Sequence, residues 1–251
     1  MRVLRIAFLN IYFYLAFVLF SINSFAALGS LFIVLAIILP KRQAFKRLRR
    51  MISWYGAVII RILPFPFVRI DYKDLTDQGQ EEGPYLFVCN HRSASDPFLM
   101  AIFPYEIIQI VNIWPFRVPF LGFIAKFAGY LSVREIPFEE FFQKSCSLIQ
   151  QGVSIAVFPE GTRSRNKTLG QFHSAIFRVA LETKCAIVPV CITGNELIPP
   201  IGSGLLHPGV IKIHRLKKIT YDEYSNFSPF KLKNYVRDII AEEVKLMDQE
   251  K

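Results

Sequence analysis

The sequence predicts an α/β protein with a single mixed-sheet domain, preceded by a membrane-embedded helical hairpin. No charged side chain occurs from Ile6 to Pro40, which is typical of a segment that lies in lipid. From Tyr85 onward, apolar runs of strand length alternate with amphipathic runs of helix length. Polar motifs directly follow two of these strands, where open α/β sheets place functional residues. We therefore expect a membrane-anchoring region over 1–70 and an α/β domain over 71–251.

The composition indicates a partner that has both negative charge and an apolar part. The chain has 251 residues, 52% of them hydrophobic, with 24 Phe and a formal net charge of +10. Such a charge fits nucleic acid or an anionic membrane. The densest basic run, Lys41 to Arg50, directly follows the long apolar stretch, as a juxtamembrane cluster does, and we find no nucleic-acid motif. We therefore expect a lipid membrane as partner and no nucleic acid.

The charge-free N-terminal stretch is too long for one simple span. As a straight helix it would be ~52 Å long, against a hydrocarbon core of ~30 Å. Arg2 and Arg5 precede it and the basic run follows it, so the positive-inside rule favours both ends on the cytoplasmic side. We expect a hairpin that reverses at the polar residues Ser21–Ser24. A tilted single span with an interfacial helix is the alternative.

The segments between this stretch and the α/β domain predict further contact with the membrane. A signal peptide is disfavoured, because the apolar run continues from Leu28 to Leu39 beyond the Ser-Phe-Ala site. Met51 to Val68 predicts an interfacial helix that ends at prolines. Asp71 to Pro84 is expected to be a polar connector. Four cysteines without C-x-x-C spacing indicate a reducing compartment, so we expect the α/β domain on the cytoplasmic side of the inner membrane.

The α/β domain is expected to contain strands and helices in rough alternation. The predicted strands are 85–89, 107–111, 130–134, 153–158, 186–193 and 210–216. The predicted helices are a short one opening at Pro97, then 118–128, 137–151, 172–183 and 231–247.

The first motif, Asn90 to Asp96, pairs an imidazole with a carboxylate. A neutral His91 imidazole can accept a proton near pH 7, and Asp96, five residues later across a turn, can orient it. No G-x-S-x-G motif occurs, so the attacking oxygen is expected to belong to a substrate alcohol. A histidine that only completes a turn is the more common case, and Asn90 fits a role in holding that turn. Cys89 is disfavoured as a nucleophile because it ends an apolar strand.

The second motif, Phe158 to Ser164, predicts a strand that runs into an anion-binding turn. Its backbone N–H groups and the forked guanidinium of Arg163 suit a phosphate. Glu160 would repel a phosphate unless it pairs with a cation or hydrogen-bonds an acceptor hydroxyl. A plain surface β-turn is the alternative explanation for the motif.

Together the motifs resemble those of the glycerolipid acyltransferases typified by 1-acylglycerol-3-phosphate (lysophosphatidate) acyltransferases. The resemblance covers roughly Tyr85 to Thr193, with the family's N-H-x-x-x-x-D and F-P-E-G-T-R-S blocks intact. The K-x-P-x-x-G block is similar to Arg117–Gly122, with Arg in place of Lys, and V-P-V is Val188–Val190. One block departs from the family pattern: Val133 is followed by Arg134-Glu135 where Val-Asp-Arg is common. We therefore expect the pocket for the acceptor lipid to differ from that of other family members.

The resemblance implies direct acyl transfer from a thioester to the free hydroxyl of 1-acylglycerol-3-phosphate, which makes phosphatidic acid. It implies that His91 is the base and that Asp96 orients it, with acyl-CoA or acyl-carrier protein as co-substrate, no cofactor and no metal. The residues expected to bind substrate are Asn90, Arg117, Arg134, Glu160, Gly161, Thr162 and Arg163.

Three alternatives remain at this point. The acceptor can be another lysophospholipid or a lyso amino-acid lipid. A membrane thioesterase would use the same His91 and Asp96 to activate water, without a cationic pocket. A catalytically silent membrane-binding protein would keep only the basic N-terminal region, which the presence of both motifs argues against.

Overall fold

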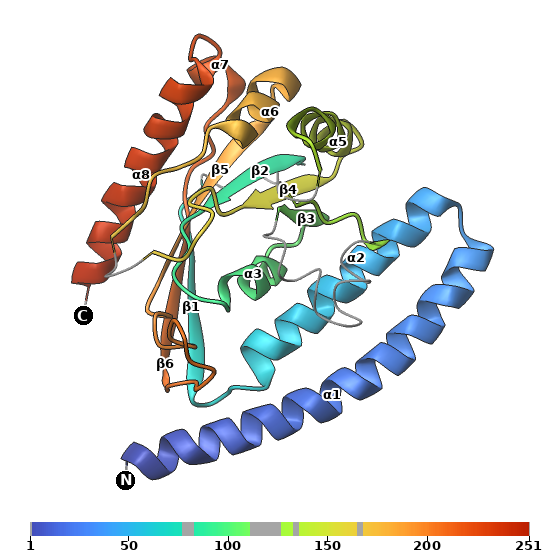
Figure 1. Cartoon of the computed structure of the whole chain (residues 1–251), viewed down its shortest axis with the longest axis vertical. Helices are drawn as coiled ribbons and strands as arrows, with labels where there is room; N and C mark the ends of the chain where they lie inside the picture. The colour runs from blue at the N-terminus through green and yellow to red at the C-terminus, as the bar shows by residue number, and fades with distance from the viewer. Residues whose placement is uncertain (1, 77–82, 111–126, 133–135, 165–167, 251) are drawn as a thin grey trace. The chain divides into compact units, whose positions relative to one another are not determined.

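The computed structural model describes residues 2–76, 83–110, 127–132, 136–164 and 168–250 (Figure 1). The chain divides into two compact units. Unit 1 comprises Met1–Ile70, Ser93–Pro104 and Gly194–Ile211, and unit 2 comprises Asp71–Arg92, Tyr105–Thr193 and Lys212–Lys251. Two segments that follow residue 71 thus belong to the same unit as the N-terminal region. The functional division into 1–70 and 71–251 stays a prediction.

The N-terminal apolar stretch of unit 1 is one continuous helix, α1 (Arg2–Ile38). It is long and apolar enough to cross a membrane, and in its most apolar window 11% of the residues are buried. The predicted reversal at Ser21–Ser24 is wrong. This polar cluster contains no Pro or Gly. Asn23 Nδ2 donates to Leu19 O within the helix at 2.7 Å, and the Ser21 hydroxyl forms a hydrogen bond with the hydroxyl of Tyr55, a residue of the next helix.

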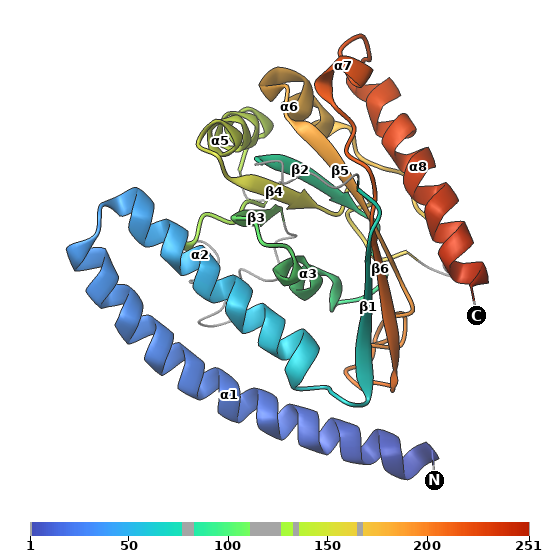
Figure 2. The same cartoon turned by 180° about the vertical axis from the view of Figure 1, so that it is seen from behind.

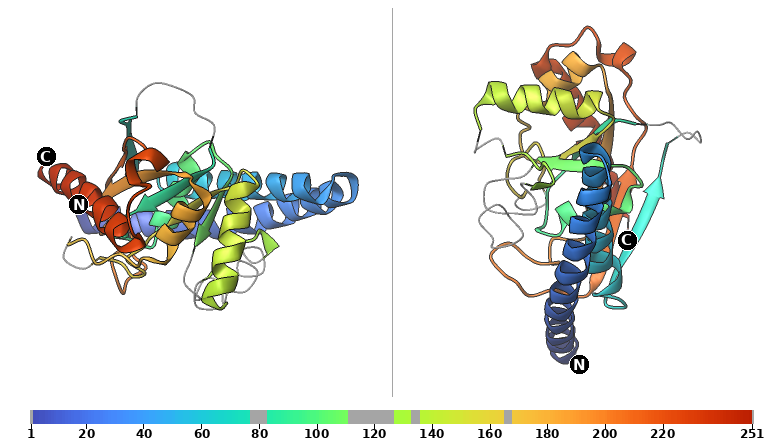
Figure 3. Two further views of the ribbon diagram at one scale, coloured as in Figure 1. Left: turned by 90° about the horizontal axis from the view of Figure 1, so that it is seen from above. Right: turned by 90° about the vertical axis from the view of Figure 1, so that its right-hand side faces the viewer.

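The chain reverses at Pro40 instead, and α2 (Lys41–Ala57) then runs back beside α1 (Figure 2, Figure 3). A helical hairpin therefore exists, but the basic run forms its second arm and not a linker. The helix continues as η1 (Val58–Ile62) and ends before the prolines, as predicted. The arms pack through aromatic residues, and the Phe20 and Tyr55 rings stack with 5.5 Å between centroids.

The sheet is mixed, which confirms the predicted fold class. Its order is β1-β6-β5-β2-β4-β3, with β2 parallel to both β4 and β5, β3 parallel to β4, and β6 antiparallel to β5. The strands are β1 (Val68–Asp74), β2 (Tyr85–Cys89), β3 (Ile107–Ile110), β4 (Ser154–Val157), β5 (Ala186–Thr193) and β6 (Gly209–Arg215).

Five strands were predicted to within about a residue or two, and β1 was not. β1 occupies the start of the predicted polar connector: it is an edge strand, and all its residues after Val68 are at least partly exposed. Such a strand carries no apolar alternation to signal it. Of the predicted strand 130–134, Leu131 forms a single bridge with Ile110, while 133–135 lie outside the described residues. The predicted helix 118–128 lies mostly outside them too.

Three helices of unit 2 cover one face of the sheet. The core joins alternate residues of β2 and β4, such as Leu86, Val88, Ile155 and Val157, to these three helices. The three are α5 (Phe138–Gln150), α6 (Ala175–Thr183) and α8 (Pro229–Gln249), with the short α7 (Tyr221–Tyr224) before α8. The remaining short helices, α3 (Asp96–Leu99) and η2 (Met100–Ile102), belong to unit 1.

Candidate active site

Within unit 2, the sheet topology brings the first part of the first motif, Asn90–Arg92, beside the second motif. Strands β2 and β4 are parallel neighbours, with Val88 opposite Val157. The segments that begin at Asn90 and Phe158 therefore leave the same carboxyl edge of the sheet. This edge is where parallel α/β sheets carry their ligand-binding loops.

Asn90 ties the end of β2 to β5. Its side chain is fully buried, Nδ2 donates to Ile192 O at 2.8 Å, and Oδ1 accepts from Ile192 N–H at 2.7 Å. The amide thus replaces a missing step of the β-ladder. These contacts hold the chain just before His91, and a direct role for Asn90 in binding substrate stays a prediction.

The backbone of His91 is fixed on both sides by the second motif. Its N–H donates to Glu160 Oε1 at 2.8 Å, and its carbonyl accepts from Ser164 N–H at 2.6 Å. The half-buried imidazole packs against Phe158, with 4.9 Å between ring centroids. The structure therefore joins the two motifs directly and gives the imidazole a defined place.

Glu160 bonds to its own chain with both carboxylate oxygens. It is 7% exposed, and besides the His91 N–H it accepts from Ser164 Oγ at 2.6 Å and Gly170 N–H at 2.7 Å. The sequence had led us to expect a cation or an acceptor hydroxyl as its partner. Three donors from the two loops take that place, so the carboxylate shapes the site, and its predicted contact with substrate stays a prediction.

The turn that follows Glu160 presents Arg163. Gly161 has φ of 69°, a left-handed conformation that favours glycine, and its N–H closes the turn onto Phe158 O at 3.0 Å. That N–H is therefore occupied and not free for an anion, whereas Thr162 is exposed. Arg163 is partly exposed and forms no hydrogen bond or ion pair with any residue that the structure describes. Its guanidinium is available to an anionic ligand.

His173 lies beside the same turn, which the sequence did not indicate. Its N–H donates to Pro159 O at 2.9 Å, and a Cβ placed on Gly161 would lie 3.3 Å from its Nε2. The side chain is exposed. A second imidazole is thus present at the edge of the Glu160–Ser164 turn, brought there by a loop closure that no spacing rule predicts.

Asp96 begins α3 in unit 1 and is fully buried. Its Oδ2 accepts from Ser93 N–H at 2.8 Å, and its Oδ1 accepts from the side-chain amide of Asn195. Ser93 Oγ in turn donates to Ile198 O at 2.8 Å. Asn195 follows β5 and was missed, because its contact with Asp96 spans 99 residues of sequence. The predicted pairing of Asp96 with His91 stays a prediction.

Two predicted substrate ligands, Arg117 and Arg134, lie outside the described residues. In the part of the chain that the structure describes, no three His, Cys, Asp or Glu side chains lie close enough together to hold a metal ion. Cys89 is fully buried at the end of β2, which agrees with the interpretation that it is not a nucleophile.

Comparisons with known proteins agree on one family. Residues 69–193 match the family described as Acyltransferase. A chloroplast 1-acyl-sn-glycerol-3-phosphate acyltransferase of Arabidopsis thaliana is 28% identical over 153 residues, 59% of this chain and 43% of that protein. A lyso-ornithine lipid O-acyltransferase of Pseudomonas aeruginosa is 29% identical over 150 residues, 58% of this chain and 54% of that protein. The matched part thus spans about half the length of these two relatives.

A solved structure shares the whole fold. The crystal structure of a 1-acyl-sn-glycerophosphate acyltransferase from Thermotoga maritima has a TM-score of 0.78 to this chain, with 20% sequence identity. The likeness covers 100% of this chain and 99% of the other. At this identity the likeness shows the fold and not the chemistry.

Proposed function

This chain belongs to the glycerolipid acyltransferase family, and from that premise we propose that it is a membrane-bound O-acyltransferase. It moves a fatty acyl group from an acyl thioester to the free glycerol hydroxyl of 1-acylglycerol-3-phosphate and so makes phosphatidic acid. The observation that carries the proposal is the double backbone contact between His91 and the Glu160–Ser164 turn, which joins a base to the loop that carries Arg163.

The chemistry needs one base and no covalent enzyme intermediate. The neutral imidazole of His91 takes the proton of the acceptor hydroxyl as its oxygen attacks the thioester carbonyl. The new C–O bond forms, the C–S bond breaks, and the thiolate leaves and takes up a proton. A thiol has a reference pKa of ~8.5, so it leaves without a strong general acid. In this proposal Asp96, whose two oxygens are already fixed by Ser93 and Asn195, orients the imidazole.

The acceptor phosphate is proposed to bind Arg163. The guanidinium is accessible, and its planar fork matches two oxygens of a phosphate. Thr162, Arg117 and Arg134 remain proposed acceptor contacts from the sequence. Asn90, Glu160 and Gly161 support the site through the backbone contacts described above. The proposal needs no metal and no cofactor, and acyl-CoA or acyl-carrier protein is the donor.

A lyso amino-acid lipid is the second candidate acceptor. The Pseudomonas relative is a lyso-ornithine lipid O-acyltransferase, and this chain departs from the family pattern at Arg134-Glu135. A zwitterionic headgroup offers less negative charge to Arg163 than a phosphate monoester does. The two acceptors are therefore separable by substitution of Arg163.

We further propose that unit 1 attaches to one leaflet of the membrane. α1 contacts α2 at Ser21–Tyr55 and again where the Phe32 and Phe45 rings lie 6.3 Å apart. A membrane-crossing α1 would draw the cations of α2 into the hydrocarbon, at a cost of ~2.5–3.5 kcal/mol each at the centre. An α1 that lies along the surface avoids this cost. The proposed location is the cytoplasmic face of the inner membrane.

The test uses the purified full chain in vesicles with acyl-CoA or acyl-carrier protein as donor. Lysophosphatidate, a lyso-ornithine lipid and no acceptor form the three arms, and acylated lipid and free fatty acid are both measured. We expect phosphatidic acid from the first arm, and a fall of about 10²–10⁴-fold in kcat for His91→Ala. The matched control is His207→Ala, which should keep wild-type activity. Acyl transfer at the wild-type rate by His91→Ala would refute the mechanism.

Two further outcomes decide between the candidates. Arg163→Ala should raise KM for lysophosphatidate and leave KM for the donor unchanged, because the guanidinium contacts only the acceptor. Preference for the lyso-ornithine lipid, with no effect of Arg163→Ala, would favour the second acceptor. Release of free fatty acid at full rate without any acceptor would indicate a thioesterase.

A further inference from the structure

The C-terminal helix α8 lies outside the part of the chain that matches the family, which ends at residue 193. Two of its polar side chains nevertheless reach the loops of the candidate active site within unit 2. Asp248, in the last turn, contacts the residue after His91, and Arg237, three helical turns earlier, contacts the loop that holds Glu160.

Asp248 neutralises the buried guanidinium next to the proposed base. Arg92 is 2% exposed, and its Nη1 and Nη2 donate to Asp248 Oδ1 and Oδ2 at 2.8 and 2.6 Å. This bidentate geometry is the strongest that the two groups can form. A buried cation that loses its carboxylate partner is disfavoured, so Asp248 contributes to the position of Arg92. Since Arg92 follows His91 directly, the pair also fixes the chain at His91.

Arg237 fixes the other end of the same network. Its Nε donates to Gly170 O at 2.9 Å and its Nη2 donates to Leu169 O at 3.1 Å. Gly170 N–H in turn donates to Glu160 Oε2, and Glu160 Oε1 accepts from His91 N–H. A chain of three contacts therefore links α8 to the backbone of the proposed base.

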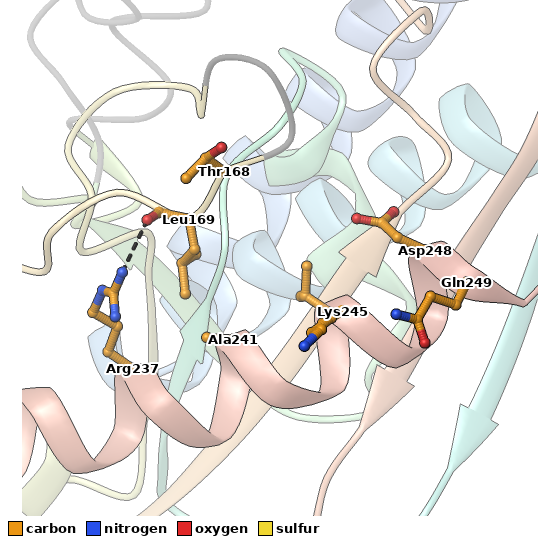
Figure 4. Close-up of a pocket in the computed structure, with 8 residues that line it drawn as sticks. Thr168, Leu169, Arg237, Ala241, Lys245, Asp248 and Gln249 are labelled. Carbon is orange, nitrogen blue, oxygen red and sulfur yellow. Dashed lines mark hydrogen bonds between the residues drawn. The ribbon is translucent and has the colours of Figure 1, made fainter.

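Among the described residues, a pocket separates part of this loop from the side of α8. A cavity of about 390 Å³ lies between the loop at Thr168 and Leu169 and the side of α8. Figure 4 shows Arg237 at one end of the row of α8 residues that line it and Asp248 with Gln249 at the other, with Ala241 and Lys245 between them. The hydrogen bonds from Arg237 to Leu169 and Gly170 therefore join the loop to α8 beside this pocket.

We propose that Arg237 and Asp248 are positioning residues for acyl transfer, an inference that rests on the function proposed above. They hold His91 and the Arg163 turn in place from a helix that contributes no atom to the reaction. A displacement of about 1 Å in a reacting group can lower a rate by ~10²-fold, so contacts of this kind affect kcat without touching substrate.

Effects on the stability of unit 2 can be separated from effects on the position of the loops, because apolar contacts hold α8 independently of Arg237 and Asp248. Its apolar side packs into the main core of unit 2, so loss of one polar contact leaves the helix in place. The α8 residues buried in that core are Leu232, Val236, Ile240, Val244 and Met247.

The test compares Asp248→Asn and Arg237→Met with Lys245→Gln as the matched control. Lys245 lies between them on the helix and forms no hydrogen bond or ion pair within the described part of the chain. Asp248→Asn should lower kcat about tenfold with KM unchanged, because Asp248 holds the guanidinium of Arg92, next to His91. Arg237→Met should lower kcat and also raise KM for the acceptor, because its loop continues to Arg163. Arg237→Lys, which keeps one donor, should recover part of the loss.

A second measurement is independent of activity. Amide hydrogen exchange at His91, Ser164 and Gly170 should be about tenfold faster in Arg237→Met than in the wild type, and unchanged in Lys245→Gln. Gly170→Ala should produce the same change from the other side, because its Cβ would lie 2.9 Å from Glu160 Oε2.

The outcomes separate the two proposals. If the wild type transfers no acyl group, the proposed function fails, and the exchange data still decide whether α8 holds the loops. Wild-type kinetics together with wild-type exchange in Asp248→Asn and Arg237→Met would overturn the positioning role. Equal losses in Lys245→Gln would also overturn it, since the effect would then be one of general stability.

Discussion

At the residue scale, the polar side chains around the candidate site mostly bond to the protein's own backbone. Asn90 and Glu160 both do so, and each joins segments that are far apart in sequence. Such bonds reduce the conformational freedom of the segments that they join. The proposed base and the proposed anion ligand are therefore preorganised before substrate arrives.

In unit 1, substitution of Asn195 tests whether such hydrogen bonds support the proposed reaction. Asn195→Ala leaves Asp96 Oδ1 without its amide donor, and we expect kcat to fall about tenfold while KM stays the same. A buried acceptor that loses its partner also costs about 1–3 kcal/mol of stability, so thermal unfolding should be measured beside the kinetics. Asn226→Ala, an exposed substitution of the same kind, is the control. Wild-type kcat in Asn195→Ala would show that Asp96 needs no such support.

Only part of this network was accessible from the sequence. His91, Asp96 and the Glu160–Ser164 turn were found because they occur in short motifs after apolar strands. The partners of Arg92 and Asp96 were not, because these contacts span 156 and 99 residues and follow no periodicity. The three donors that bond Glu160 were not predicted either, since a sequence does not show which N–H and O–H groups face a carboxylate.

At the element scale, fully buried strands were the most predictable part of the fold. Strands β2, β3 and β4 are buried at every residue, and their apolar runs give the signal. The reversal of the N-terminal helix was not predictable in the same way. Ser and Asn are satisfied inside a helix by bonds to the preceding turn, so a polar cluster in an apolar stretch does not by itself break it.

The attachment of α1 to unit 1 gives a prediction at this scale. Asn10 Nδ2 donates to Leu206 O at 2.9 Å and Asn10 Oδ1 accepts from Leu206 N–H at 2.8 Å. Asn10→Leu should remove both bonds and expose the loop at Ser203–Leu206 to protease several-fold faster. Asn23→Leu is the matched control on the same helix, because Asn23 bonds only Leu19 O. Equal cleavage rates in the two variants would contradict the attachment.

At the scale of the whole molecule, positive charge and apolar surface occur together in unit 1. α1 exposes apolar side chains over most of its length, and α2 exposes cations that include Lys46, Arg47 and Arg50. An apolar surface binds lipid at any ionic strength, whereas cations select anionic lipid and are screened by salt. Membrane binding should therefore have one salt-sensitive and one salt-insensitive part.

Neutralisation of Lys46, Arg47 and Arg50 tests whether membrane binding has a salt-sensitive and a salt-insensitive part. Changing Lys46, Arg47 and Arg50 to Gln should weaken binding to anionic vesicles about 100-fold at low salt, at about 1 kcal/mol per charge. The difference should largely disappear near 1 M salt, and binding to neutral vesicles should not change. The control changes Lys144, Lys184 and Lys218 of unit 2 to Gln, which alters net charge equally. A similar loss in that control would mean that total charge matters and its location does not.

The cysteines have a practical consequence for depth measurements in the bilayer. All four are free and buried, and burial raises the pKa of the Cys185 and Cys191 thiols. A bulky, water-soluble maleimide should accordingly leave the folded native protein unlabelled. A single cysteine introduced at successive turns of α1 then becomes the one reactive thiol, and a fluorophore attached to it reports the immersion of that turn by collisional quenching.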